Sequence, residues 1–255
     1  GRFTVTLGGD HSLSIASLAA ALKIYPDLRV LWIDAHADIN TPSSSPSGNL
    51  HGMPVAALLG LFDLSYRSEF SWLKPSLKAQ QIAYLGVRDL DLGEKKTLSD
   101  LKIATYTSKD VQNLGIKSLF AKIKAELGIQ ADTPTYTSLD FDGLDPSQAP
   151  ATGLRVPHGI KLSDFLKLIQ LTKSQSHWIG SDLVEFNPFM ARSQSEMLTT
   201  LSTAESFFDL LPWQANKLEP RLKILPSLLM KEELSNQSQV SFRRGWQTKF
   251  NSCMF

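Results

Sequence analysis

The segment Asp34-Ala35-His36-Ala37-Asp38 follows the apolar run 30–33 directly, and it constrains the fold more than any other part of the sequence. A short apolar run of this kind is typical of a strand buried on both faces, as in parallel sheets covered by helices. Because side chains alternate along an extended chain, positions 34, 36 and 38 are expected to project to one side. Two carboxylates and an imidazole would then converge, and a bound cation would offset the cost of burying them.

Two further polar clusters follow predicted strands. Asp140 and Asp142 come after a second apolar strand, and His11 follows the glycine pair 8–9, which permits a tight turn at a strand end. Asp145 is expected to orient the next turn or to support a ligand rather than to bind metal itself. Each cluster alone has an ordinary explanation as a turn, a helix cap or a structural histidine. All three at strand ends of one sheet favour a common metal site.

The candidate ligands are more numerous than the four that one tetrahedral zinc site uses. Their four carboxylates carry a charge that two divalent ions would balance, and shared carboxylates can hold two ions about 3.5–4 Å apart. Oxygen-rich ligation with two imidazoles and no thiolate favours a hard ion such as manganese. We therefore expect two Mn²⁺ per chain, bound by His11, Asp34, His36, Asp38, Asp140 and Asp142.

Strand-like and helix-like segments alternate along the chain, which predicts an α/β fold with three α/β/α layers around a mainly parallel sheet. In such sheets ligands gather beyond the carboxyl ends of the strands. Ser163 is expected to cap a helix running through Ile169. The other expected helices cover 14–24 and 118–127, and the expected strands cover 3–7, 30–33, 82–87, 135–139 and 178–184.

Composition excludes several classes of partner. The 26 basic and 25 acidic residues are interspersed and leave a formal charge of +1, so no basic stripe predicts nucleic-acid binding. No apolar run approaches the roughly 20 residues that cross a bilayer, and we expect no membrane partner. The single cysteine, Cys253, forms no internal disulfide, which fits a reducing compartment.

The three polar clusters together resemble the signature motifs of the ureohydrolases, in the same order. The matching stretches are Gly-Gly-Asp-His-Ser (8–12), Asp-Ala-His-Ala-Asp (34–38) and Ser-Leu-Asp-Phe-Asp-Gly-Leu-Asp-Pro (138–146). The segments Asp38-Ile39-Asn40-Thr41-Pro42 and Ser47-Gly48-Asn49-Leu50-His51-Gly52 are similar to arginases in particular.

The resemblance implies an arginase-like metallohydrolase domain over residues 1–216, with the N-terminal part of the usual fold absent, and a C-terminal tail of uncertain structure over 217–255. It also implies a homo-oligomer, by analogy a trimer. A cytoplasmic location is expected, and a mitochondrial one stays open because an address signal would precede this segment.

The implied reaction is the hydrolysis of L-arginine to L-ornithine and urea. By resemblance, Asp34 and Asp140 bridge the two ions, His11 and Asp38 complete one site, and His36 and Asp142 complete the other. Glu185 would pair with the guanidinium, Asp38 would carry a proton locally, and His51 would pass it to solvent. The resemblance assigns the α-carboxylate and α-ammonium of the substrate to Asn40, Ser47, Asn49, Asp91 and Glu94.

One loop departs from the arginase pattern. Arginases have Thr-Pro-Val and then paired glycines where this chain has Leu154-Arg155-Val156-Pro157-His158-Gly159. We expect this difference to weaken catalysis without abolishing it. Two alternatives therefore stay open: a ureohydrolase for another guanidino compound, similar to agmatinase or formiminoglutamase, and a catalytically weak metal-binding homologue with a regulatory or partner-binding role.

Overall fold

The computed structural model describes residues 2–212, and their strands form one parallel sheet in the order β1-β6-β5-β2-β3-β4. The central strand β2 carries the apolar run found in the sequence, and its residues 30–33 are fully buried. The strands are β1 (Thr4–Leu7), β2 (Arg29–Ile33), β3 (Ile82–Val87), β4 (Ala104–Thr107), β5 (Pro134–Asp140) and β6 (His177–Val184).

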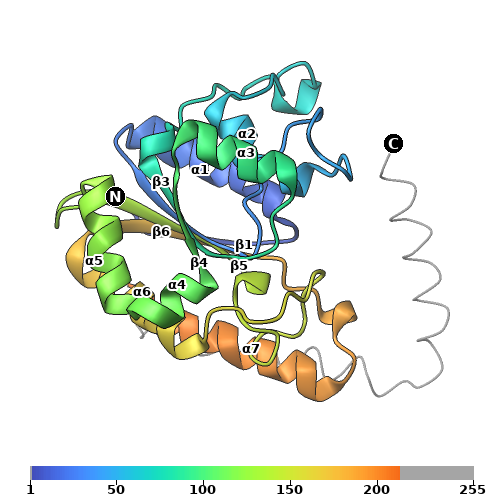
Figure 1. Cartoon of the computed structure of the whole chain (residues 1–255), viewed down its shortest axis with the longest axis vertical. Helices are drawn as coiled ribbons and strands as arrows, with labels where there is room; N and C mark the ends of the chain where they lie inside the picture. The colour runs from blue at the N-terminus through green and yellow to red at the C-terminus, as the bar shows by residue number, and fades with distance from the viewer. Residues whose placement is uncertain (1, 213–255) are drawn as a thin grey trace. The chain divides into compact units, whose positions relative to one another are not determined.

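Helices cover both faces of the sheet. Helices α1, α2 and α3 lie above the sheet in Figure 1, and α6 and α7 lie below it. The helices are α1 (Ser14–Ile24), α2 (Pro54–Leu59), α3 (Leu92–Leu101), α4 (Ser108–Leu114), α5 (Ile116–Leu127), α6 (Leu162–Gln175) and α7 (Gln194–Phe208). Short 3-10 helices are η1 (His11–Leu13), η2 (Leu50–Gly52), η3 (Ser68–Phe70), η4 (Ala79–Gln81), η5 (Phe141–Gly143) and η6 (Pro188–Met190).

Large aromatic side chains fill the space between the sheet and its covering helices. Trp32 on β2 lies beside Tyr84 on β3 and packs with it edge to face, the ring centroids being 6.4 Å apart. Burying aromatic side chains of this size contributes strongly to stability, so the core holds β2 firmly at the centre of the sheet. The strand end that follows, which carries the predicted metal ligands, is therefore fixed in position.

The predicted three-layer α/β fold with a parallel sheet is confirmed, and all five predicted strands are present. Strand β4 was not predicted, because its sequence Ala-Thr-Tyr-Thr lacks an apolar run and it lies at the edge of the sheet. The prediction of Ser163 as a helix cap is wrong: α6 begins at Leu162 after the N-cap Lys161. The predicted tail 217–255 lies outside the described residues.

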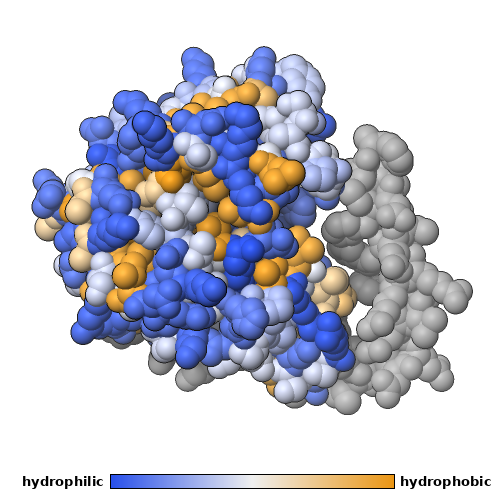
Figure 2. All heavy atoms as spheres, in the orientation of Figure 1, coloured by the Kyte–Doolittle hydropathy of each residue, from blue (hydrophilic) through white to orange (hydrophobic). Residues whose placement is uncertain are grey.

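The face seen in Figure 2 is mostly hydrophilic, with hydrophobic residues in separate small patches. Among residues 2–212, no helix is both long and apolar enough to cross a membrane.

Candidate metal centre

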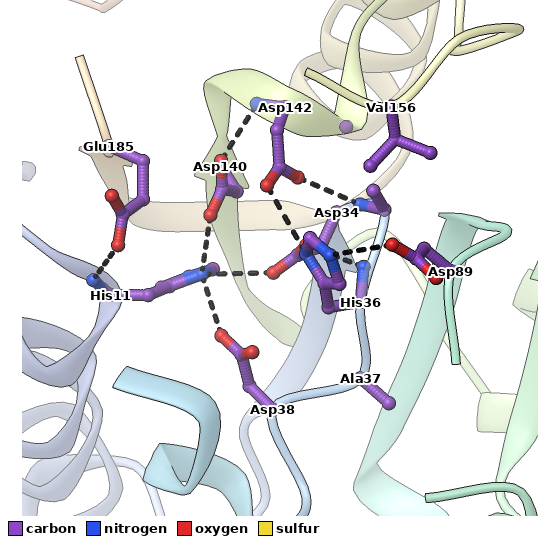
Figure 3. A network of polar contacts seen from close by, with 12 residues as sticks. His11, Asp34, His36, Ala37, Asp38, Asp89, Asp140, Asp142, Val156 and Glu185 are labelled. Atoms are coloured by element: carbon purple, nitrogen blue, oxygen red, sulfur yellow. Dashed lines mark hydrogen bonds and ion pairs between the residues drawn. The ribbon is translucent and has the colours of Figure 1, made fainter. Parts of the chain in front are cut away.

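Three loops at the carboxyl end of the sheet bring the predicted ligands together, as Figure 3 shows. His11 begins the 3-10 helix η1 just beyond β1, residues 34–38 leave β2, and Asp140 ends β5 with Asp142 in the turn that follows. In parallel strands these ends lie on the same edge. Residues far apart in the sequence therefore share one small volume.

His11 faces one group of carboxylates. Its Nδ1 atom lies 3.0 Å from Asp34 Oδ2, 3.1 Å from Asp38 Oδ2 and 3.3 Å from Asp140 Oδ2. These four side chains are almost completely buried. The sequence prediction that His11, Asp34, Asp38 and Asp140 converge is therefore confirmed in geometry.

His36 faces a second group that shares one carboxylate with the first. Its Nδ1 atom lies 3.4 Å from Asp34 Oδ1 and 3.2 Å from Asp142 Oδ2. Asp34 thus turns one oxygen toward His11 and the other toward His36. Within the described residues, the Asp34 carboxylate belongs to two groups whose ligand atoms lie close enough together to hold a metal ion. One group is His11, Asp34 and Asp140; the other is Asp34, His36 and Asp142.

Hydrogen bonds behind His11 determine which ring nitrogen is free for a metal. Its Nε2 atom lies 3.0 Å from the Ser138 hydroxyl, which lies 3.2 Å from the buried carboxylate of Asp182. If Ser138 donates to Asp182, it accepts from Nε2–H of His11, which leaves Nδ1 with a lone pair pointing into the cluster. Trp32 stacks on the imidazole at 4.0 Å between ring centroids and fixes the ring plane.

Ser138 and Asp182 were missed by sequence reasoning. Ser138 precedes Asp140 by two positions on β5, so the strand period that identified the ligands also places Ser138 on the same side. Asp182 is an acid within a mostly buried strand, β6, where it also accepts hydrogen bonds from Ser14, Ser17 and Tyr136. A buried acid in an apolar strand was the available signal, because such a group requires partners.

Without a bound cation, the carboxylates of the cluster repel one another when all of them are charged. Burial and the charge of Asp34 raise the pKa of Asp38 to about 7 and that of Asp142 to about 6. Burial and the charge of Asp142 raise the pKa of Asp140 well above its usual range. Although burial opposes it, hydrogen bonding to Asp142 and Asp34 raises the pKa of His36 to about 12. Crowding of like charges in a buried site raises the pKa values of the carboxylates, and the nearby opposite charges raise that of His36.

The residues present fit two divalent metal ions. The Nδ1 atom of His11 is buried without a hydrogen-bond partner among the described residues, yet it faces three carboxylate oxygens. An unpaired imidazole nitrogen costs free energy when buried, and coordination to a metal would satisfy it. Positive charge between the carboxylates would also lower their pKa values and remove their mutual repulsion.

Two of the loops touch through their main chains. A Cβ atom added to Gly143 would lie 2.8 Å from the main-chain nitrogen of Asp34, closer than real contacts allow. The loops after β2 and β5 can approach this closely only because residue 143 is glycine.

Asp38 and Glu185 adopt left-handed backbone conformations, with φ of 50° and 64°, which non-glycine residues adopt only where the surroundings enforce them.

A cavity of about 290 Å³ opens above the cluster. His51, at the centre of the 3-10 helix η2, contributes to its wall, and its Nδ1 atom lies 3.5 Å from Glu185 Oε1. The same Glu185 oxygen accepts the main-chain N–H of His11 at 2.9 Å. The hydrogen bond that the His51 imidazole donates to Glu185 raises the pKa of His51. The carboxylate of Glu185 and the partly exposed imidazole of His51 thus line the same cavity as the predicted metal ligands.

Most of the predicted substrate-binding residues line this cavity. Asn40 donates to Asp91 Oδ2 at 2.7 Å, and Ser47 is exposed at the cavity wall. Glu94 also lines the cavity, but its carboxylate accepts the main-chain N–H groups of Ala37 and Asp91. Asn49 is exposed and does not line the cavity, but its main-chain N–H donates to the hydroxyl of Ser47 at 3.2 Å.

The sequence model of the arginase family matches residues 1–209. The chain belongs to the arginase family. It is 41% identical over 206 residues to the hepatic arginase of Aquarana catesbeiana, an alignment that covers 80% of this chain and 64% of that protein. The chain therefore spans less than two thirds of the length of this arginase.

Solved arginase structures have the same fold. The crystal structure of arginase from Bacillus subtilis matches with a TM-score of 0.73 and 34% identity, over 84% of this chain and 73% of that one. The Entamoeba histolytica arginase solved in complex with L-ornithine matches with a TM-score of 0.72 and 32% identity, over 81% of this chain and 70% of that one. The predicted family resemblance is thus confirmed.

Proposed function

We propose that this member of the arginase family hydrolyses L-arginine to L-ornithine and urea with two divalent metal ions, Mn²⁺ in the native protein. The observation that carries the proposal is the position of Asp34, whose two oxygens face His11 on one side and His36 on the other. A carboxylate shared in this way is what a pair of bridged ions requires. The alternative of a catalytically weak metal-binding homologue would use the same carboxylates, so a measurement of activity has to distinguish it from an enzyme.

Six side chains would hold the ions: His11, Asp34, His36, Asp38, Asp140 and Asp142. When bound, the two ions would lower the pKa of water in the site and so supply a nucleophile at neutral pH. Free water attacks a guanidinium poorly, because that group stays protonated and is stabilised by resonance. The remaining requirements are to hold the guanidinium in place and to move protons, and side chains of this chain can do both.

Glu185 is placed to hold the guanidinium. Its carboxylate lines the cavity beside the cluster, and the hydrogen bond from the main chain of His11 fixes one oxygen at 2.9 Å. A carboxylate and a guanidinium pair in a planar, directional way, so Glu185 would orient the carbon that is attacked. Asp38, which also lines the cavity, would carry a proton to the departing amine.

His51 is placed to exchange that proton with solvent. Its side chain is 37% exposed and lies at the cavity wall. An imidazole titrates near neutral pH, so it can take up and release protons under working conditions. The exposed location connects the reacting end of the cavity to bulk water.

The polar end of the cavity suits an amino-acid substrate. Asn40, Ser47 and Asp91 lie on its wall and can hydrogen bond to a carboxylate and an ammonium group. The L-ornithine complex of the Entamoeba histolytica arginase supports this choice, because ornithine carries both groups. Asn49 and Glu94 are retained as proposed contacts of these groups, Asn49 from outside the cavity wall.

Urea release from a panel of guanidino compounds tests the proposal. The full chain is loaded with Mn²⁺ and assayed with L-arginine, agmatine and other guanidino acids, with Asp140→Asn as the inactive control. We expect a much higher kcat/KM for arginine than for agmatine, since polar groups built for a carboxylate would go unpaired with agmatine. A preference for another guanidino compound would support the alternative ureohydrolase. No urea from any compound, with two metals bound, would support the weak homologue.

A further inference from the structure

The loop formed by residues 153–158 borders the cavity, and we call it the 153–158 loop. Gly153 and Leu154 line the cavity, and the Leu154 side chain is 54% exposed at its mouth. No hydrogen bond between main-chain groups joins residues 153–158 to another described residue. The conformation of the loop must therefore depend on side chains.

Arg155 ties this loop to helix α7. Its Nη1 atom donates to Glu196 Oε1 at 3.1 Å, and its Nη2 atom donates to Glu196 Oε2 at 2.9 Å. Nη2 also donates to the main-chain oxygen of Met190. Both charged side chains are largely sheltered, with 17% of Arg155 and 28% of Glu196 exposed. A two-point pair of this kind has one preferred geometry, unlike an ordinary surface ion pair.

The acceptor Glu196 is itself fixed. It lies in the first turn of α7, and its carboxylate accepts the main-chain N–H of Arg192 at 2.7 Å. Its own main-chain N–H donates to the hydroxyl of Ser193, the N-cap of the helix, at 3.2 Å. Arg155 also lowers the pKa of Glu196, which keeps the carboxylate charged. The loop is thus attached to a rigid helix end.

A second guanidinium holds the loop from the opposite side. Arg88 donates to the main-chain oxygens of Val156 at 2.7 Å and Pro157 at 3.0 Å. It also donates to the main-chain oxygen of Asp142, a predicted metal ligand. Arg88 therefore secures the part of the loop nearest the metal centre, and Arg155 secures the part nearest Leu154.

We propose that Arg155 is a positioning residue: its two-point pair with Glu196 takes over the conformational restriction of the proline found here in other arginases and holds Leu154 at the cavity mouth. This inference rests on the proposed function, because the loop matters only if substrate enters the cavity. Leu154 is exposed at the mouth of the cavity, and its apolar side chain has no group that can take part in proton transfer. Losing its position should therefore weaken substrate binding more than the chemical step.

The experiment compares variants of the full Mn²⁺-loaded chain. Arg155→Met and Glu196→Gln remove the pair, and Arg155→Lys keeps the charge without the two-point geometry. Lys96→Met is the matched control, because it removes the exposed ion pair with Asp100 on helix α3.

Two quantities are measured. The first is kcat and KM for arginine, and the second is the rate of trypsin cleavage after Arg155 in the Glu196→Gln protein. Cleavage after the exposed Lys78 serves as the internal reference.

Removal of the pair should raise KM about three- to tenfold, the effect of one lost hydrogen-bonded contact, and change kcat less than about twofold. Arg155→Lys should fall between the parent and Arg155→Met, and Lys96→Met should match the parent. Trypsin must bind the arginine side chain, so freeing it in Glu196→Gln should speed cleavage after Arg155 at least about fivefold relative to cleavage after Lys78.

An unchanged cleavage rate after Arg155, or faster cleavage with KM unchanged, would overturn the inference. A KM in Arg155→Lys equal to that of the parent would show that two-point pairing is not needed and would also overturn the inference. If the parent releases no urea, the proposed function fails, while the trypsin rates still decide whether the pair holds the loop.

Discussion

Glu94 accepts a hydrogen bond from the main-chain N–H of Ala37 at 3.2 Å, which attaches helix α3 directly to the loop that carries Asp34, His36 and Asp38. The carboxylate is buried, and its other oxygen accepts the N–H of Asp91, the N-cap of α3. Burial and the charge of Asp91 raise the pKa of Glu94. Glu94 therefore acts on the metal loop through the main chain as well as bordering the cavity.

We predict that Glu94→Ala weakens Mn²⁺ binding about tenfold to a hundredfold, the usual effect of removing a group that orients metal ligands. Glu94→Gln keeps an oxygen that can accept from Ala37, so it should bind Mn²⁺ within a fewfold of the parent. Isothermal titration calorimetry with Mn²⁺ measures the affinity of each variant. Equal affinities for the parent and Glu94→Ala would show that the hydrogen bond does not support the loop.

The second prediction concerns metal content. The full chain should bind two divalent ions, and Asp140→Asn should lose at least one of them. Asp145→Asn is the matched control, because Asp145 lies five residues further along but accepts hydrogen bonds from Ser147 and Gly159 instead of facing the cluster. Elemental analysis after dialysis gives the stoichiometry. Two ions retained in Asp140→Asn would contradict the proposed ligand set.

The third prediction follows from the contact between His51 and Glu185. Glu185 raises the pKa of His51 above its ordinary value of 6.5, so the pair stabilises the fold fully below that value. This contribution is lost as pH rises through the raised pKa, because His51 becomes neutral. Glu185→Gln should therefore lower the free energy of unfolding of the metal-free chain more at pH 6 than at pH 9.

His51→Asn provides the control for this pH effect. In that background Glu185→Gln should cost the same at both pH values, since the titrating partner is gone. An NMR titration of the His51 ring should also show a lower midpoint in Glu185→Gln than in the parent. A midpoint that does not move would contradict the assigned contact.

The fourth prediction concerns the altered glycine pair. His158 is exposed and has a left-handed φ of 64°, a conformation that glycine adopts without strain. We expect His158→Gly to stabilise the protein by about 1 kcal/mol, or about 2–4 °C in Tm. His177→Gly is the matched control, because His177 begins strand β6 and glycine weakens extended strands. Thermal unfolding that shows a loss of stability in His158→Gly would contradict the assignment.

The second glycine of the pair could not have been replaced in the same way. A Cβ atom on Gly159 would lie 2.3 Å from the main-chain carbon of Leu144. The sequence shows that one glycine is kept and one is lost, but only the structure shows why. Gly159 packs against main chain, whereas residue 158 needs only a left-handed backbone and has open surroundings.

Local patterns in the sequence were sufficient to predict which side chains meet in the cluster. Asp34, His36 and Asp38 follow an apolar strand, and alternation along the strand identifies the residues that share a side. The parallel fold then brings the strand ends together. In contrast, Asp182 and Ser138 meet through strand register, and no pattern within either strand indicates their pairing.

The anchoring of Arg155 could not be predicted because its partner is 41 residues away on a helix that the sequence patterns did not identify. In the sequence alone, arginine in place of proline removes a restriction on the backbone φ angle and gives no sign of a replacement restraint. The structure supplies a restraint that proline cannot provide, because it acts between two elements. For this reason we expect Arg155→Pro to disturb the loop rather than to restore the family pattern.

The main-chain contact between Gly143 and Asp34 has a consequence for the choice of metal. Because the loops after β2 and β5 touch through their main chains, the packing of the sheet would set the distance between the two proposed ion positions. A larger or smaller divalent ion must then be accommodated by rotation of the carboxylates. Discrimination among ions of similar size would consequently depend on the freedom of these side chains, and substitutions in the surrounding helices could adjust it without touching a ligand.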